Sequence, residues 1–387
     1  MEKIWNKKFI LLFITNLLMM ATFYASVPII PVYCAEVDIT GSKIGIVLTA
    51  MSITTVLFRP FAGYIIDNFN RYRVYLLFLG LFTLSFLGFS LFKAFSILVL
   101  IRLYMGVVYS VCGSSTMTLA GDVLPQKKVS EGINRFTLTI SIGMAVGPFV
   151  GIQIQNHMSS KASFITLFAL CVIAFIFVSM CRIEYSKQKP KSFSLKGAFY
   201  GPAVPFMLNM MFIMIPFGAM LAYSAMLAQE KGISSVTPYF YVCLVVGMLI
   251  SKFSTQKMID TGKHKILVII CLILLTATMA SYYFMNTTVH FLIIAVLLGL
   301  GYGILQPLFQ SLVTGTTPIQ NRGTANATYM LSYDIGIGIG SLCMGFVQNT
   351  IGLSTGFTLT AIAYVVAGLI FLCYTDGYYR NLLQNNK

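Results

Sequence analysis

Residues 8–32 read KFILLFITNLLMMATFYASVPIIPV, a run of 25 residues whose one charged side chain is the lysine at its start. An α-helix rises 1.5 Å per residue, so about 20 apolar residues cross the ~30 Å hydrocarbon core of a bilayer. The run is longer than the apolar part of a secretion signal and has no clear small-residue cleavage site. We therefore expect a retained membrane-spanning helix.

Eleven similar runs follow. The twelve runs are 8–32, 44–66, 74–93, 95–119, 133–156, 162–182, 203–228, 236–257, 265–285, 289–313, 324–350 and 354–375. Backbone polar groups in hydrocarbon must be satisfied within helices or closed barrels, and these runs lack the alternation of barrel strands. Only 10% of the 387 residues are charged, against about 25% in soluble domains. The sequence predicts an all-α integral membrane protein with twelve transmembrane helices.

Lys and Arg residues are distributed unequally between the predicted loops. With the N-terminus inside, 20 of the 26 fall on the cytoplasmic side and four, Lys43, Lys93, Lys161 and Lys231, fall on the other. This bias follows the positive-inside rule, and one missed span would invert every later loop. We expect a multi-pass protein of the cell (inner) membrane with both termini cytoplasmic. The net charge of +15 then reflects topology, and no nucleic-acid partner is expected.

The longest hydrophilic connection, 184–201, is rich in Lys, Ser and Pro and divides the chain almost in half. It predicts two six-helix bundles, 1–183 and 202–387, joined by a cytoplasmic linker, an arrangement that secondary transporters use. A weak internal echo supports pseudo-symmetry, because two sets of residues share the same internal spacings: Arg59, Asp67 and Arg71 in one half, and Lys252, Asp260 and His264 in the other.

The predicted loop after the second run carries the most specific motif. Residues 59–73 read RPFAGYIIDNFNRYR and resemble the loop motif of the major facilitator superfamily, G-x-L-x-D-r-x-G-r-k. Asn70 stands at the second glycine and is expected to accept the left-handed conformation. Arg71 or Arg73 can pair with an acid at another cytoplasmic helix end, and Asp122, just after the fourth run, is the candidate. The resemblance implies that such contacts latch an outward-open state. The residues concerned are Arg59, Gly63, Asp67, Arg71, Arg73 and Asp122.

Gly63 is expected to let two helices approach closely, as small residues do in membranes. Asp67 can lie near the positive N-terminal end of a neighbouring helix.

The fourth run contains Arg102 and Gly106, a pattern that resembles the family's second motif, R-x-x-q-G, with Met105 at the usual glutamine. An arginine inside a span costs at least ~2.5 kcal/mol on insertion scales, so Arg102 is expected to face the bundle interior with a partner. The alternative is an arginine whose head reaches the outer interface.

The fifth run contains Gly143, Gly147, Pro148 and Gly151, which resemble the motif of antiporters in the family. Small residues at every fourth position form a smooth packing face, and proline removes one backbone hydrogen bond and permits a kink. In the family this motif favours export. Two further stretches, 28–33 and 321–328, resemble drug:proton antiporters, so the resemblance covers the whole chain.

Asp334 is the one acidic residue at mid-span depth, in the eleventh run. An ionisable group inside the membrane is a functional candidate, and burial raises a carboxyl pKa. Asp334 is therefore a candidate proton or cation site. A structural acid bonded to the backbone or to a neighbouring side chain is the alternative.

The first run offers only Asn16, where many drug antiporters carry an acid, and the His, Glu and Arg cluster of sugar symporters is absent from the tenth run. The remaining polar candidates for a substrate cavity are equally open to roles in helix packing. They are Asn16, Tyr24, Tyr109, Asn209, Gln306, Gln310, Tyr329 and Tyr333.

These features predict a secondary transporter that works by alternating access, with proton-coupled export of small apolar or amphipathic compounds (multidrug or metabolite efflux). The alternative is a symporter or uniporter for a small nutrient such as a sugar or an amino acid. The chain contains no HExxH, GxSxG or P-loop motif and no Cys/His cluster, so we expect no enzyme, cofactor or metal site. Expected partners are a small-molecule substrate, protons and the lipid bilayer, and the expected state is a monomer.

Overall fold

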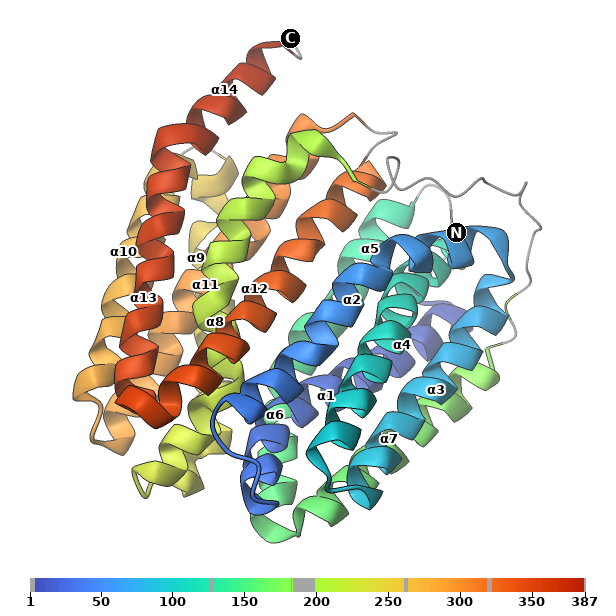
Figure 1. Cartoon of the computed structure of the whole chain (residues 1–387). Coiled ribbons are helices and arrows are strands. Elements are labelled where there is room, and N and C mark those ends of the chain that lie inside the picture. The colour runs from blue at the N-terminus through green and yellow to red at the C-terminus, as the bar shows by residue number, and fades with distance from the viewer. Residues whose placement is uncertain are drawn as a thin grey trace. The chain divides into compact units, whose positions relative to one another are not determined.

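The computed structural model describes residues 4–125, 128–181, 183, 199–260, 264–318 and 322–385. Within these ranges the elements are helical (Figure 1). Twelve helices of the described part are long and apolar enough to cross a membrane. Each one overlaps one of the twelve predicted runs, so the prediction of an all-α, twelve-span membrane protein is confirmed.

The helices up to residue 181 follow one another closely along the chain. They are α1 (Lys7–Glu36), α2 (Ser42–Asn68), α3 (Arg71–Leu91), α4 (Phe95–Asp122), α5 (Val129–Phe136), α6 (Leu138–His157) and α7 (Ser160–Ser179).

The later helices begin after a short 3₁₀ turn, η3 (Gly201–Ala203). They are α8 (Val204–Glu230), α9 (Thr237–Asp260), α10 (His264–Ser281), α11 (Thr288–Thr316), α12 (Arg322–Ile351), α13 (Leu353–Ile370) and α14 (Asp376–Asn385), with short turns η4 (Ser234–Val236) and η5 (Tyr282–Phe284) and a π-helical segment, η7 (Phe371–Thr375).

The chain forms two compact units. Unit 1 comprises Met1–Ile39 and Ala50–Phe193, and unit 2 comprises Thr40–Thr49 and Ser194–Lys387. Most of the predicted linker, residues 184–198, lies outside the described residues. Because Thr40–Thr49 belongs to unit 2, the first turns of α2 pack with that unit, and the rest of the helix belongs to unit 1.

In unit 1, α3 packs against both α4 and α7. A Cβ added to Gly80 would touch the Phe175 ring of α7 at 3.4 Å, and one added to Gly88 would touch Ile101 of α4 at 3.0 Å. At the far end of α3, Phe89 stacks on Phe164 with ring centroids 5.0 Å apart. Small residues thus set the helix spacing, while aromatic pairs fill the gaps.

In unit 2, α8 packs along α12 and α9 packs along α11 (Figure 1). A Cβ on Gly218 of α8 would lie 2.5 Å from the Ile337 backbone of α12. A Cβ on Gly336 of α12 would in turn lie 2.5 Å from the Met211 carbonyl of α8. Lipid tails are as apolar as leucine, so close backbone contact is a main source of helix association in a bilayer. Glycine is what permits this contact.

The unit 2 segment Thr40–Thr49 lies against α12. Thr49 Oγ1 donates to the Gly338 carbonyl at 3.0 Å, and Gln348 Nε2 donates to the Gly41 carbonyl at 2.9 Å. Between these bonds, a Cβ on Gly345 would lie 2.6 Å from the Gly45 Cα. The segment is thus held by hydrogen bonds at both ends and a glycine contact between them.

Two helices differ from their predicted runs. The run 133–156 is interrupted at Thr137, which is not part of either helix and separates α5 from α6. The last helix changes to π geometry over Phe371–Thr375 before α14. Hydropathy cannot predict either change, because a break or a π-helical turn within an apolar run does not alter which residues the run contains.

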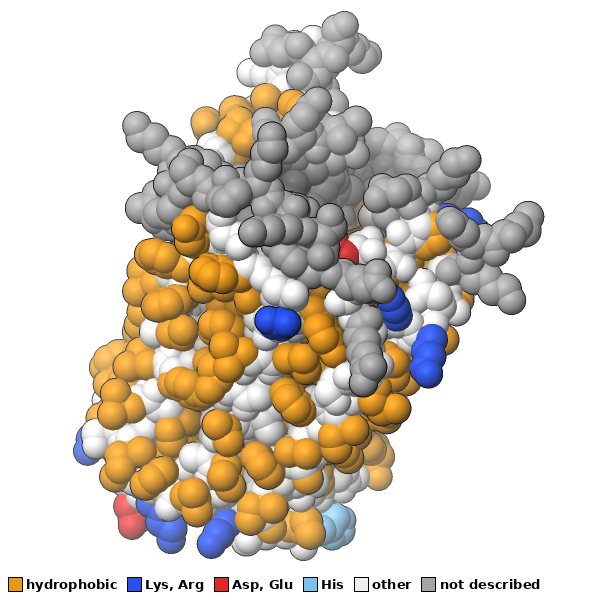
Figure 2. Space-filling model, turned by 90° about the vertical axis from the view of Figure 1, so that its right-hand side faces the viewer, with side chains coloured by type: hydrophobic (Ala, Val, Ile, Leu, Met, Phe, Trp, Pro, Cys, Tyr) orange, Lys and Arg blue, Asp and Glu red, His pale blue; other side chains and the backbone are white. Residues whose placement is uncertain are grey.

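The exposed surface is largely apolar, as lipid contact requires. Figure 2 shows one face on which hydrophobic side chains cover most of the described surface, with Lys and Arg side chains toward its upper and lower ends. Leu57, Leu77 and Leu100 are each at least 60% exposed. In water such exposure would be a liability, whereas in a bilayer it provides the lipid-facing surface.

We predict that Gly299→Ala destabilises the protein by ~1–3 kcal/mol, the usual cost of overpacking. The added Cβ would clash with the Leu244 carbonyl oxygen of α9. Gly315→Ala is the matched control, since it lies on the same helix with nothing within 4 Å of its added Cβ among the described residues. The measurement is the midpoint of thermal denaturation in detergent. Equal midpoints for the two variants would contradict the packing account.

Candidate transport site

Asp334 lies on α12, near the middle of that 30-residue helix, and is half-buried. Its neighbour Tyr333 has its hydroxyl 3.5 Å from that of Tyr329. The Tyr329 hydroxyl donates to the Gln306 carbonyl of α11 at 3.1 Å. The residue that precedes Asp334 therefore belongs to a short chain of hydroxyl groups that joins α12 to α11.

The helix that carries Asp334 is held firmly over the two turns that follow it. Gly336 and Gly340 press against α8, with their added Cβ atoms meeting the carbonyls of Met211 and Ile215. One turn beyond Asp334, the Gly338 carbonyl accepts from Thr49. A functional group on a rigid element keeps its geometry better than one on a loop.

Helix α11 contributes amide groups near the same level. The Gln306 carbonyl accepts from Tyr329, and its side-chain Nε2 is buried with no hydrogen-bond partner among the described residues. Gln310, one turn further along α11, is half-buried. A buried unpaired donor is costly, so Gln306 is well suited to recognise an acceptor on a ligand.

Unit 1 presents aromatic side chains instead. The rings of Phe23 and Tyr109 stack with centroids 4.5 Å apart and planes at 21°, and Tyr24 contacts Phe23 edge-on at 5.0 Å. The Tyr109 hydroxyl lies 3.9 Å from Met20 Sδ. All three rings are half-buried. The cluster joins α1 to α4 and offers flat apolar faces.

Asn16 and Asn209 are completely buried and tie helices together. Asn16 Nδ2 donates to Thr139 Oγ1 of α6 at 2.6 Å. Asn209 Nδ2 donates to Thr375 Oγ1 of the π-helical segment at 2.5 Å. Of the two roles open to these residues, the geometry shows the helix-joining one.

Arg102 of α4 is buried, with 4% of its surface exposed. Its Nη1 lies 3.7 Å from Sδ of Met105, the residue at the usual glutamine of the motif. The guanidinium thus lies inside unit 1. It does not extend to the outer membrane interface, which was the alternative expectation for this arginine. Gly106, the last motif position, packs against Met51 and Thr54 of α2.

The structure pairs Arg71 with Asp122. Nη1 of Arg71 lies 2.9 Å from Oδ1 and 3.0 Å from Oδ2 of Asp122, and Nε donates to the Ile66 carbonyl at 3.3 Å. The pair joins the start of α3 to the end of α4. Arg73 is exposed, and Arg59 is half-buried within α2.

Two expectations for this loop are wrong. Asn70 has φ −63° and ψ 104°, not a left-handed conformation, and its side chain caps α3 by accepting from the backbone N–H groups of Tyr72 and Arg73. Asn is one of the favoured N-cap residues. Gly63 makes no close helix contact, because no described heavy atom lies within 4 Å of its added Cβ. Gly106 provides the close approach to α2 instead. The Asp67 side chain lies outside the described residues.

The span-five glycines form the contact between α6 and α1. Cβ atoms added to Gly143 and Gly151 would lie 2.7 Å from Met20 Cβ and the Ala25 carbonyl, and one on Gly147 would lie 2.9 Å from Tyr24 Cβ. Pro148 follows Gly147 directly within α6. The motif therefore places its glycine face directly against the helix that carries Phe23 and Tyr24.

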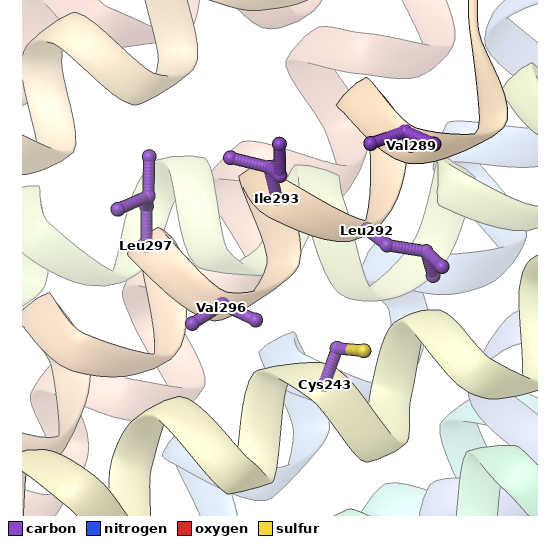
Figure 3. Close-up of a pocket in the computed structure, with 6 residues that line it drawn as sticks. All are labelled: Cys243, Val289, Leu292, Ile293, Val296 and Leu297. Atoms are coloured by element: carbon purple, nitrogen blue, oxygen red, sulfur yellow. The ribbon is translucent and has the colours of Figure 1, made fainter.

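An apolar cavity of about 290 Å³ lies between α9 and α11 (Figure 3). Cys243 of α9 faces Leu292 and Val296 of α11, and Val289, Ile293 and Leu297 complete the lining. None of the predicted site residues lines it. With no charge and no hydrogen-bonding group beyond one thiol, it has little means to recognise a polar substrate.

Comparison with known proteins agrees with the motif reading. A family model described as the Major Facilitator Superfamily matches residues 12–341 and 262–385. The chain belongs to this superfamily. It is accordingly a multi-pass membrane transporter of small molecules, not an enzyme.

Among curated proteins, the chain is 23% identical over 361 residues to the staphylopine export protein of Staphylococcus aureus (strain Mu50 / ATCC 700699), covering 87% of this chain and 88% of that protein. It is 26% identical over 187 residues to the quinolone resistance protein NorA of Staphylococcus aureus (strain MRSA252), covering 48% of each.

Solved structures share the fold at low identity. The nucleoside transporter NupG matches with a TM-score of 0.76 and 16% identity, over 95% of this chain and 98% of that one. The D-xylose-proton symporter matches with a TM-score of 0.76 and 12% identity, over 94% and 97%. At these identities the likeness establishes the fold alone.

Sequence reasoning missed one polar cluster, around Asp376 at the start of α14. Asp376 is 5% exposed and pairs with Lys265 and Arg380, and it faces His264. His264 had been noted in the sequence, as the last of three residues whose spacing repeats that of Arg59, Asp67 and Arg71. Asp376 follows the last apolar run, where an acid looks like an ordinary solvent-exposed residue.

We predict that Arg71 and Asp122 are energetically coupled by roughly 0.5–1 kcal/mol, the range of a partly exposed pair with good geometry. A double-mutant cycle with Arg71→Gln and Asp122→Asn, read by thermal denaturation in detergent, measures this coupling. Arg73→Gln is the control and should combine additively with Asp122→Asn. Additive effects of Arg71→Gln and Asp122→Asn would show that the contact contributes nothing.

Proposed function

We propose that this transporter is a proton-coupled exporter of small apolar or amphipathic compounds that works by alternating access. The observation that carries the proposal is Asp334, a half-buried acid at the middle of a membrane-spanning helix. Ionisable groups at such a depth mark proton relays or substrate pathways. The hydroxyls of Tyr329 and Tyr333 beside it can hydrogen-bond to a ligand or to water.

Export as the direction of transport is supported by two observations. The named relatives are an export protein and a drug-resistance protein. In addition, the span-five glycines pack tightly on α1, and Pro148 lies in the same stretch of α6. Proline weakens a helix locally. Helix α6 can therefore bend near Pro148 while its glycines keep their contact with α1.

For the substrate class, the unit 1 aromatic cluster supports flat apolar groups, since Phe23, Tyr24 and Tyr109 each leave part of a ring exposed. Within unit 2, the buried and unpaired Nε2 of Gln306 would suit a compound that carries a hydrogen-bond acceptor. We place the protein in the cell membrane with both termini cytoplasmic, on the strength of the Lys and Arg distribution. In this orientation the Arg71–Asp122 pair is cytoplasmic and would act as the conformational latch.

We predict that Asp334→Asn abolishes proton-driven efflux while the protein still reaches the membrane, since the amide keeps the shape of the carboxyl but takes up no proton. The assay is accumulation of ethidium and a fluoroquinolone panel in a bacterial host lacking its main efflux pumps, with and without an uncoupler. Cells with the unaltered protein should accumulate less of at least one compound, and the uncoupler should remove the difference.

Glu230→Gln is the matched control, because Glu230 is an exposed acid at the end of α8, and its efflux should be unchanged. Uncoupler-sensitive efflux that survives in Asp334→Asn would contradict the role of Asp334. If no compound is expelled and uptake of a sugar or amino acid rises instead, the export proposal fails.

A further inference from the structure

His264 and Asp376 face each other inside unit 2, far along the sequence from Asp334. His264 is the first residue of α10, and Asp376 is the first residue of α14. Nε2 of His264 lies 3.4 Å from Oδ1 of Asp376. Their side chains are 17% and 6% exposed, so the contact is largely shielded from water.

These two facing atoms have no hydrogen-bond partner among the described residues. The other carboxylate oxygen, Oδ2, is already engaged, by Arg380 Nη2 at 3.0 Å and Lys265 Nζ at 3.3 Å. A carboxylate offers only acceptors, so Oδ1 and Nε2 attract each other only when a hydrogen lies on the nitrogen. A buried, unpaired acceptor is costly. A neutral imidazole with its hydrogen on Nε2 can donate weakly to Oδ1, and a charged imidazole adds the attraction of opposite charges.

The charged and titratable groups around the imidazole come from two elements in the described part of the chain. Lys265 lies on α10, and Asp376, Tyr379 and Arg380 lie on α14. The Tyr379 ring covers one side of the imidazole, with centroids 4.8 Å apart. The two cations and the N-terminus of α10 oppose a charge on His264. However, Lys265 and Arg380 are 43% and 60% exposed, so water and salt screen their effect.

We propose that His264 and Asp376 form a second proton-binding site, distinct from Asp334, which holds α14 on α10 more tightly when the imidazole is charged than when it is neutral. The protonated pair adds one charge-assisted hydrogen bond, Nε2–H to Oδ1, to the two ion pairs on Oδ2. Histidine is in general the side chain that proteins use to respond to pH.

The release has a direct mechanical route into the unit. Asp376 follows Thr375, the last residue of the π-helical segment, and Thr375 accepts from Asn209 of α8. Helix α8 in turn carries the glycine contacts with α12. π-Helical segments are common at functional sites and distortable points of helices. Loss of the proton therefore loosens the joint between α13 and α14 where it meets α8.

Cys373 is an exposed residue of the π-helical segment and provides a reporter. Replacing Cys243 and Cys343 by Ser leaves Cys373 as the one cysteine that is not buried. A nitroxide label there, read by electron paramagnetic resonance on the purified full chain in detergent, reports the mobility of the joint. Between pH ~5.5 and ~8 the ratio of immobile to mobile label should fall roughly five- to tenfold, as expected for loss of one charge-assisted hydrogen bond.

Two His264 variants separate the proposal from a general pH effect. His264→Arg carries a permanent charge and should keep the label immobile throughout, while His264→Ala should give the mobile spectrum at every pH. His290→Ala, at the start of α11, is the control and should follow the parent. The proposal is overturned if the parent shows no change with pH, or if the parent's change persists in His264→Ala.

Discussion

The structure depends on one constraint: within hydrocarbon, every backbone polar group must find its partner inside the protein. The twelve apolar runs satisfy this constraint as helices, and helix association then has to come from close packing, because lipid solvates leucine as well as another helix does. Glycine supplies that packing here. The pairs α8 with α12, α9 with α11, and α6 with α1 all meet through glycines whose added Cβ atoms would strike the neighbouring helix.

The same constraint makes each buried polar side chain informative, since a polar group in this setting is costly unless it is paired. Asn16, Asn209 and Tyr329 use their side chains to join one helix to another. Other buried atoms have no hydrogen-bond partner among the described residues, among them Gln306 Nε2, the facing atoms of His264 and Asp376, and the Oδ1 atoms of the same two asparagines. Groups of this second kind are the ones that a substrate or a proton can satisfy, and they motivate both proposals made above.

Hydropathy and charge predicted the span count, because both follow from the bilayer itself. The pairing of Asp122 with Arg71 or Arg73 was expected from which helix ends share a side, and the structure shows Arg71 as the partner. Local geometry was less accessible. Asn70 was assigned by analogy with a glycine, yet its side chain could also cap a helix and does so. Gly63 was expected at a helix contact that Gly106 makes. Asp376 was missed because its burial arises only from the packing of α14 on α10.

The central claim is that proton movement through Asp334 drives export, and substrate-induced proton flux tests it most directly. Inverted membrane vesicles with an acid interior, monitored with a pH-sensitive acridine dye, should lose part of their gradient when ethidium or another compound from the efflux panel is added. The account predicts this response for the unaltered protein and none for Asp334→Asn. An unchanged gradient with a compound that the protein does expel, or an equal response in Asp334→Asn, would contradict it.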